Sequence, residues 1–411
     1  MTSTVDQLCP PSTGPQKAPT SSKSMPGVGE ESYLVDLPRE LGRVVGRQPG
    51  PTLICMGGLH GNEPAGVLAL RLVLESLQSQ ADVLCGELIA LVGNRQALAI
   101  GKRFIDHDLN RAWHPERLSR LLKSTGHGEA EDREQLELDA TLQRIVDEAP
   151  GRVFMLDLHT TSGPGSAFAI LDDTLPNREI ALDFPVPLVL GLEEELAGTL
   201  ASYLTGQGVT VLGFEAGQHD DPGSVDRAEA AVWVALDSSG LLGDGDRTRV
   251  VEARRILTEQ TASDIGIVEI LFRYDIDSSN GFSMVPGFES FQTIEEGQVL
   301  ARSGSETVVA PQSGMLLMPL YQEQGEDGFF LTRQVRPFWL PVSARLRSWR
   351  LERFLHWLPG ITRHPDRADA FLVDQDVARF SPLHMFHLLG FRREGKDGQI
   401  LTMTRRPDLE S

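Results

Sequence analysis

Residues 51–79, PTLICMGGLHGNEPAGVLALRLVLESLQS, decide the fold class of this chain. The apolar run 51–57 ends in glycine and has the length of a buried strand. The apolar residues at the end of the quoted stretch recur with a helical period, which predicts a helix. Between them, the turn GGLHGNEPAG (57–66) carries His60 and Glu63. We therefore expect a strand, a polar turn and a helix, in that order, as the first unit of an α/β fold.

The same alternation continues along the chain on the C-terminal side of this unit. Further strands are predicted at residues 87–92, 153–158, 167–171, 186–190 and 209–214. Helices are predicted at residues 64–79, 129–148, 192–206 and 224–242. Strands that alternate with helices favour a mixed, mostly parallel sheet flanked by helices.

The composition changes at both ends of this alternating region. Residues 1–30 are rich in Ser, Thr, Pro, Gly and Lys, which predicts a disordered tail before a catalytic domain at 31–265. Residues 266–342 consist of short apolar runs between glycine-centred turns and predict a small all-β domain that covers the pocket. Residues 343–411 mix helical and strand patterns, so we expect a C-terminal α+β extension, whose role the sequence leaves open.

The charge and composition exclude several classes of protein. Of the 411 residues, 40% are hydrophobic and 23% are charged, which is a normal globular mixture. The formal net charge of -20 disfavours binding to nucleic acid and to anionic membranes. No run approaches the roughly 18 apolar residues of a membrane helix. The three cysteines include no C-x-x-C pair, so we expect neither a disulfide framework nor a thiolate metal site, and we predict a cytoplasmic protein.

Two polar clusters at predicted strand ends have the residue types of a catalytic zinc site. His60 and Glu63 lie three residues apart in the first glycine-flanked turn, and His159 ends the strand in the motif DLHTT. Two imidazoles and a carboxylate, with a fourth position open to water, are typical of catalytic zinc. Asp157, two residues before His159, is a candidate to orient a ligand imidazole.

Two further clusters supply cations and a general base. The segment GKRFIDHDLNRAW (101–113) contains Arg103, Asn110 and Arg111, and guanidinium groups bind carboxylates with two hydrogen bonds. These arginines would attract an anionic substrate despite the acidic surface. Glu215 follows a predicted strand, and a carboxylate beside a metal-bound water is the usual general base in hydrolysis.

In this order the motifs G-G-x-H-G-N-E, D-L-N-R, D-L-H-T-T and E-x-G-Q resemble the succinylglutamate desuccinylase/aspartoacylase family, a branch of the zinc carboxypeptidase-like hydrolases. The resemblance covers roughly residues 35–340, including the β-rich part. It implies one zinc ion per chain, and the ligands matched by position are His60, Glu63 and His159.

The resemblance also implies roles for the other matched residues. Glu215 would activate the water and then donate a proton to the leaving amine, and Arg103 would polarise the scissile carbonyl. Asn110 and Arg111 would hold the carboxylate of the amino acid. The sequence departs from the family at the substrate-binding tyrosine of the β-domain, since Tyr321 is only nearby. It also has no clear match to the arginine that grips the acyl-side carboxylate, so the acyl group stays open.

The sequence therefore predicts a zinc-dependent hydrolase that cleaves the amide bond of an N-acylated amino acid or a related small carboxylate. A zinc carboxypeptidase or peptide amidase and an ester or thioester hydrolase are alternatives that use the same residues. A non-catalytic metal- or ligand-binding module is the alternative from another class. The expected partner is a small anionic molecule, with neither nucleic acid nor membrane, and the chain is a candidate homo-oligomer.

Overall fold

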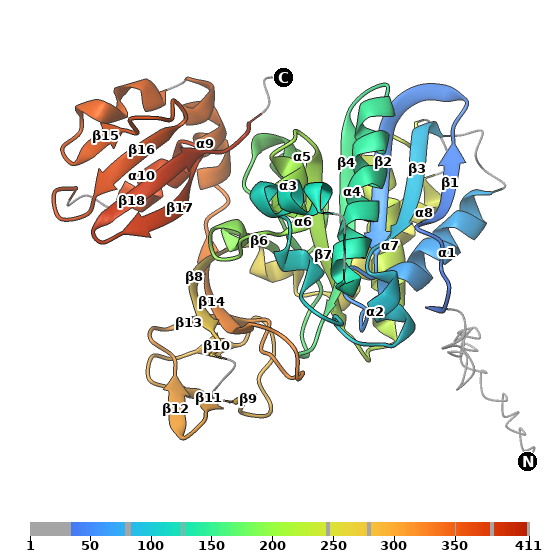
Figure 1. Ribbon diagram of the computed structural model, residues 1–411, viewed down its shortest axis with the longest axis horizontal. Helices are drawn as coiled ribbons and strands as arrows, with labels where there is room; N and C mark the ends of the chain where they lie inside the picture. The colour runs from blue at the N-terminus through green and yellow to red at the C-terminus, as the bar shows by residue number, and fades with distance from the viewer. Residues whose placement is uncertain are drawn as a thin grey trace, which may run out of the picture.

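The computed structural model describes residues 34–78, 84–124, 126, 128–243, 247–277, 281–349, 351–378 and 382–408. The expected disordered tail, residues 1–30, lies outside the described residues. Figure 1 shows a large sheet flanked by helices, a small group of strands beneath its far end, and a C-terminal sheet beside it.

The main sheet contains eleven strands within the described residues, in the order β1-β3-β2-β4-β7-β5-β6-β8-β14-β13-β10. Their bounds are β1 Glu40–Val45, β2 Gln48–Gly57, β3 Cys85–Val92, β4 Val153–Thr161, β5 Phe168–Ile170, β6 Leu188–Leu190, β7 Thr210–Gln218, β8 Ile267–Asp275, β10 Thr293–Ile294, β13 Gly314–Leu317 and β14 Asp327–Val335. In the centre, β2 pairs in parallel with β3 and β4, and β4 pairs in parallel with β7. The mixed sheet with a parallel centre confirms the predicted fold class, and it brings the carboxyl ends of β2, β4 and β7 to one edge.

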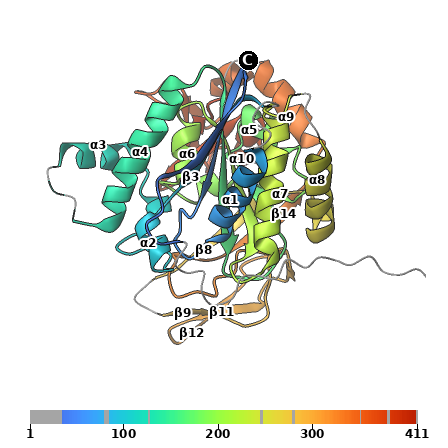
Figure 2. The same cartoon turned by 90° about the vertical axis from the view of Figure 1, so that its right-hand side faces the viewer.

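Helices cover both faces of this sheet, as Figure 2 shows with the sheet seen nearly edge-on. One face packs against α1 (Ala65–Leu77), α5 (Leu175–Ala181), α7 (Gly223–Ser238) and α8 (Thr248–Gln260), and the other against α4 (Ala130–Glu148) and α6 (Leu200–Thr205). Two shorter helices, α2 (Arg95–Ala99) and α3 (Pro115–Lys123), lie near α4. Successive residues of β2 point to opposite faces of the sheet. Cys55 packs in the apolar cluster on the α1 side and Met56 in the cluster on the α4 side.

The helix expected at 192–206 is in fact two short elements. A 3-10 helix, η4 (Leu192–Glu194), ends before Gly198, whose φ of 71° interrupts a right-handed helix. The Thr199 side chain then accepts a hydrogen bond from the Ser202 backbone N–H and begins α6. This break matters for the site because η4 and α6 both line the cavity described below.

The β-rich region 266–342 continues the main sheet. β8 pairs in parallel with β6, and β14 then pairs with β8 in an antiparallel register. Three other strands, β9 (Phe282–Met284), β11 (Val299–Ser303) and β12 (Glu306–Val309), form a small antiparallel sheet with its own apolar cluster. The β8–β6 pairing fixes this region against the rest of the main sheet.

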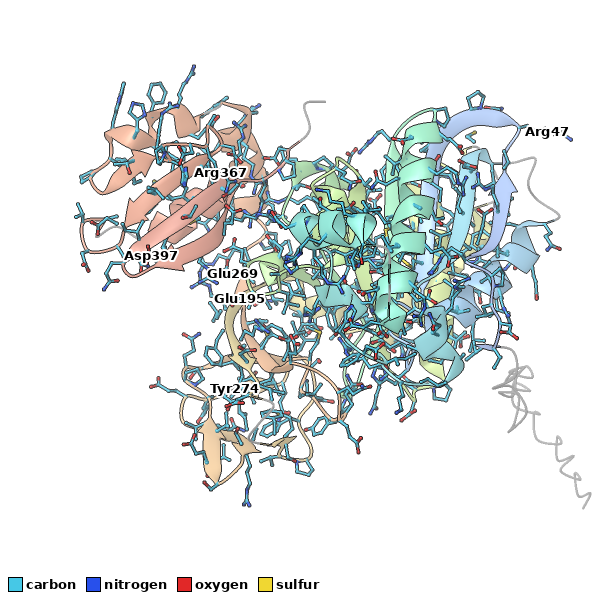
Figure 3. The ribbon with its side chains drawn as sticks, viewed as in Figure 1. Arg47, Glu195, Glu269, Tyr274, Arg367 and Asp397 are labelled. Carbon is cyan, nitrogen blue, oxygen red and sulfur yellow. The ribbon has the colours of Figure 1, made fainter. Side chains whose placement is uncertain are left out.

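The C-terminal extension forms a four-stranded antiparallel sheet, in the order β15-β16-β18-β17. Its elements are α9 Trp339–Ser348, η6 Leu351–Trp357, β15 Ile361–Arg363, β16 Ala370–Asp374, α10 Pro382–Leu388, β17 Phe391–Asp397 and β18 Ile400–Arg405. Figure 3 labels Glu195 where this sheet meets the rest of the molecule. The Glu195 carboxylate is ion-paired with Arg393 of β17, and its backbone oxygen accepts from Arg273 of β8. Glu195 therefore links the C-terminal sheet to β8.

Among the helices that the structure describes, none is both long enough and apolar enough to cross a lipid bilayer.

Candidate active site

The polar clusters meet in a cavity of about 150 Å³ at the carboxyl ends of β2, β4 and β7. His60 follows β2, whereas His159 and Glu215 lie in the last part of β4 and β7 and are paired in register. Parallel strands bring these ends together, which is why residues about 100 positions apart share one site. All eight residues given a role from the sequence line this cavity: His60, Glu63, Arg103, Asn110, Arg111, Asp157, His159 and Glu215.

The turn after β2 holds its side chains in place through close backbone contacts. Gly58 has a φ of 70°, a conformation that other residues rarely adopt. A Cβ atom on Gly61 would lie only 2.1 Å from the carbonyl carbon of Ala97. The glycines therefore let the turn fold tightly against α2, and the Glu63 backbone N–H bonds to the His60 carbonyl oxygen at 3.2 Å.

His60, Glu63 and His159 form a compact, buried triad. The Glu63 carboxylate spans the two rings, with Oε1 2.8 Å from His60 Nδ1 and Oε2 3.0 Å from His159 Nδ1. One potential ligand atom from each residue lies within 4.8 Å of the others. Two imidazole nitrogens and a carboxylate oxygen are the donor set that zinc accepts, so these residues fit such an ion.

The second nitrogen of each imidazole is also held by a carboxylate. His159 Nε2 lies 3.0 Å from Asp157 Oδ2, and His60 Nε2 lies 3.2 Å from Asp108 Oδ1. Carboxylates in this position fix the orientation of a ligand imidazole and raise its basicity. The sequence indicated Asp157, but it gave no role to Asp108, although the D-L-N-R motif contains it.

The charges of the triad shift the pKa of Glu63. Burial alone would raise this pKa, but the neighbouring His60 and His159 outweigh burial and hold it well below its usual range. The carboxyl group of Glu63 is therefore ionised and able to act as a ligand.

Glu215 lies on β7 beside the triad, and its pKa is shifted in the opposite direction to that of Glu63. Burial raises its pKa to about 7, with a further increase from Glu63 and opposing effects from the cations around it. Its Oε2 atom is buried and finds no hydrogen-bond partner in the part of the chain that the structure describes. A carboxyl group with a pKa near neutrality can both accept and return a proton.

Arg103 and Arg111 are each held by carboxylates at the rim of the triad. Arg103 donates to Asp108 Oδ2 at 2.8 Å, and it lies 3.6 Å from Glu63. Arg111 donates to Asp327 of β14 at 2.7 Å, whereas its buried Nε has no acceptor within the described ranges. Asn110 accepts a hydrogen bond from the backbone N–H of Leu200, the first residue of α6.

The β-rich region closes one side of the cavity through Gln322. Its side-chain oxygen accepts from Asn62 at 2.8 Å and lies 3.1 Å from His219 Nε2. His219 Nδ1 in turn lies 2.7 Å from the Thr160 hydroxyl. The sequence interpretation gave no role to His219 or Gln322, because neither belongs to a motif with a chemical signature. Tyr321 directs its hydroxyl to the carbonyl oxygen of Val285.

A second group of possible metal ligands, His107, Glu129 and Asp132, does not resemble a cation site. Arg117 donates to His107 Nε2 at 2.8 Å and is also paired with Asp132. The guanidinium group already supplies the positive charge that the carboxylate needs.

Residues 49–237 match the model of the succinylglutamate desuccinylase/aspartoacylase catalytic domain. Over these residues the chain carries the catalytic domain of this family. A succinylglutamate desuccinylase from Ectopseudomonas mendocina is 26% identical over 286 residues, which cover 66% of this chain and 80% of that protein. One from Serratia proteamaculans is 31% identical over 124 residues, 30% of this chain. That match spans 34% of the Serratia protein, about a third of its length.

Two solved structures have the same fold. The ectoine utilization protein EutE from Ruegeria pomeroyi has a TM-score of 0.51 at 18% identity, covering 70% of this chain and 87% of that one. A succinylglutamate desuccinylase/aspartoacylase from Rhodobacter sphaeroides has a TM-score of 0.51 at 16% identity, covering 72% and 88%. At these identities the likeness concerns the fold alone.

Proposed function

We propose that this chain is a zinc-dependent hydrolase that cleaves the amide bond of an N-acylated amino acid or a related small carboxylate. One arrangement carries the proposal. The buried His60–Glu63–His159 triad, with both outer imidazole nitrogens held by carboxylates, shares a cavity with Glu215, whose Oε2 has no hydrogen-bond partner among the described residues. A metal-binding module without catalysis has no need of a carboxylate in the position of Glu215.

The triad would hold the zinc ion through the Nδ1 atoms of the histidines and a carboxylate oxygen of Glu63. A bound zinc ion supplies Lewis acidity, which polarises a carbonyl group and makes water more acidic. Asp108 and Asp157 keep the two imidazoles oriented while this happens.

Glu215 moves the proton. Its carboxylate takes a proton from the attacking water and returns it to the nitrogen of the leaving amine, which converts a poor leaving group into a neutral amine. Burial and a pKa of about 7 suit both halves of this transfer. The proposal also explains why Glu215 Oε2 has no partner within the described residues, since that atom is free to contact water.

Arg103 and Arg111 handle negative charge at two different positions. Arg103 stabilises the charge that develops on the carbonyl oxygen, and Asp108 holds its guanidinium rigid so that no reorientation is needed. Arg111 offers its unpaired Nε to the substrate carboxylate, with Asn110 beside it. Gln322 and His219 contact each other in the cavity lining and limit the space there, which favours small substrates over peptides.

Metal content and amine release test this proposal together. Zinc would be measured by elemental analysis, and amine release would be followed on N-acetyl and N-succinyl amino acids, short peptides and the matching esters. We expect one zinc per chain in wild type, loss of zinc in His60→Ala, and retained zinc without turnover in Glu215→Gln. The exposed His356→Ala is the matched histidine control and should retain both properties. Absence of bound metal after zinc is supplied would overturn the hydrolase proposal, and faster cleavage of peptides or esters would favour those alternatives.

A further inference from the structure

The active-site cavity extends from the triad along one face of β7. Glu215, Gly213 and Val211 are alternate residues of this strand, and all three line the cavity. Four residues of strand correspond to about 13 Å. The cavity is therefore elongated, and Gly213, which has no side chain beyond a hydrogen atom, leaves its middle open.

The inner end of the cavity is formed by β5 and the segment that follows it. β5 runs antiparallel to β7, with Ile170 paired to Gly213, so Asp172 lies two residues further inward, near Val211. Besides polar residues such as Thr199, the lining includes five apolar side chains. These are Ile170, Leu192, Leu196, Val211 and Phe330. A methylene chain would pack against them without leaving a polar group unpaired.

Two carboxylates, Asp172 and Glu193, line the inner end. The Glu193 side chain is fully buried, and its Oε1 accepts from Arg406 at 2.7 Å, but its Oε2 has no hydrogen-bond partner among the described residues. Asp172 accepts one hydrogen bond, from Ser202 at 3.2 Å. A buried carboxylate oxygen without a donor is costly, so a ligand that supplies a donor would be stabilised here.

The nearby arginines do not fully balance the negative charges of Asp172 and Glu193. Arg406 shares its guanidinium between Glu193 and Glu194, and Arg392 lies across a separate small cavity from Asp172. Burial and the nearby Glu193 carboxylate nevertheless raise the pKa of Asp172 to about 7, in spite of Arg392 and Arg406. Asp172 therefore binds a proton more readily than an exposed aspartate does.

We propose that Asp172 and Glu193 bind a cationic group, an ammonium or a guanidinium, at the end of an aliphatic chain on the substrate. This inference rests on the proposed amide hydrolysis and specifies its substrate class. The chain lies along the apolar side chains of the lining, its cation donates to Glu193 Oε2, and the scissile amide lies between the triad and Glu215. A cation there gains both a hydrogen bond and an opposite charge in a site shielded from water.

Selectivity between matched substrates tests this assignment. With the zinc-loaded protein, kcat/KM would be compared for Nα-acetyl-L-lysine and N-acetyl-L-norleucine, which has the same four side-chain carbons without the ammonium. A second pair, 6-aminohexanoyl-glycine and hexanoyl-glycine, places the chain on the acyl side. We expect a preference of about ten-fold or more for the cationic member of one pair, which also identifies the side. Equal rates within both pairs would overturn the assignment.

Two variants distinguish the role of Glu193 from that of the neighbouring Glu194. Glu193→Gln retains an oxygen that accepts from Arg406 but loses the charge, so it should abolish the preference for the cationic member of each pair. Glu194→Gln is the control, because Glu194 also contacts Arg406 at 2.9 Å but is absent from the cavity lining among the described residues. A preference that survives Glu193→Gln, or that Glu194→Gln abolishes equally, would contradict the assignment.

Calorimetric binding of L-lysine and L-norleucine supplies a readout that does not require turnover. Tighter binding of lysine that is lost in Glu193→Gln supports the cation site even if no amide is cleaved, in which case only the proposed hydrolysis fails. If amides are cleaved with no charge preference in rate or binding, the proposed hydrolysis stands and the cation site is overturned. If Glu193→Gln unfolds, Asp172→Asn replaces it in both measurements.

Discussion

At the scale of single residues, Asp108 connects two functions of the site. One oxygen lies 3.2 Å from His60 Nε2, and the other accepts from Arg103 at 2.8 Å. Burial alone would raise the pKa of Asp108, but Arg103 and His60 outweigh it and hold the pKa well below its usual range. A single carboxylate therefore holds both His60, a proposed metal ligand, and Arg103, which we propose to lie beside the substrate carbonyl.

Replacing Asp108 by Asn should weaken zinc binding about 10- to 100-fold, because His60 loses the carboxylate that orients it. The affinity would be measured by competition with a chromogenic chelator. The exposed Asp147→Asn on α4 is the control and should retain wild-type affinity. Equal affinities for Asp108→Asn and wild type would show that the contact does not support the metal.

Asp172 gives a prediction for the dependence of stability on pH. Burial, together with Glu193, raises its folded-state pKa from 3.8 to about 7, while Ser202, Arg392 and Arg406 oppose the shift. A raised pKa means that its contribution is fully present below about pH 4 and is lost as the pH rises through about 7. Asp172→Asn, which cannot ionise, should therefore match wild type at pH 4 and exceed its free energy of unfolding at pH 8.

Denaturant titrations of both proteins at several pH values would measure this difference. Asp183→Asn, an exposed aspartate, supplies the baseline for the loss of one surface charge. A difference between Asp172→Asn and wild type that stays constant from pH 4 to 8 would show that Asp172 titrates normally in the folded protein.

At the scale of elements, the turn between β2 and α1 depends on backbone contact with α2. The Cβ position of Gly61 lies 2.1 Å from the Ala97 carbonyl carbon and 2.4 Å from the nitrogen of Leu98. Any side chain there must displace the turn, and the turn carries both His60 and Glu63. The close approach therefore couples local backbone packing to the geometry of the triad.

Gly61→Ala should accordingly lower the free energy of unfolding by about 1–3 kcal/mol and reduce the zinc content. Thermal unfolding and elemental analysis would measure the two effects. Gly151→Ala is the matched control, since its added Cβ meets only the carbonyl oxygen of Gly50 at an ordinary 3.5 Å. If both variants behave alike, the tight approach at Gly61 has no role in holding the site.

At the scale of the whole molecule, a buried ion network joins the C-terminal sheet to the catalytic part. Asp173, just before α5, is paired with Arg178 and with Arg347 of α9 at 2.8 Å, and it lies 3.6 Å from Arg406. Burial alone would raise the pKa of Asp173, but these three arginines hold it well below its usual range. Since Arg406 also binds Glu193, the C-terminal extension reaches the wall of the active-site cavity.

Asp173→Asn should destabilise the protein by about 3–5 kcal/mol, because it leaves buried arginines without their shared carboxylate. We expect a lower unfolding temperature and faster proteolysis of the C-terminal extension. Glu179→Gln is the control, because its pairing with Arg152 is exposed on both sides and should contribute at most about 1 kcal/mol. Equal stability of the two variants would contradict a structural role for the network.

The sequence by itself determined the alternation of strands and helices and the residue types that gather at strand ends. A strand such as 51–57 is encoded in neighbouring residues, and the end of a parallel strand fixes where its following polar side chains lie. The triad residues and Glu215 could thus be predicted from local motifs.

Only the tertiary structure decided which distant residues complete these motifs. The pairing of β8 with β6 joins residues about 80 positions apart, and the contact of Glu193 with Arg406 joins residues 213 positions apart. No periodicity in either segment specifies such contacts, because they depend on how whole layers pack. The break in the helix expected at 192–206, by contrast, has a local cause in Gly198 and the Thr199 cap. It is this break, together with the docked C-terminal sheet, that places Glu193 at the inner end of the cavity.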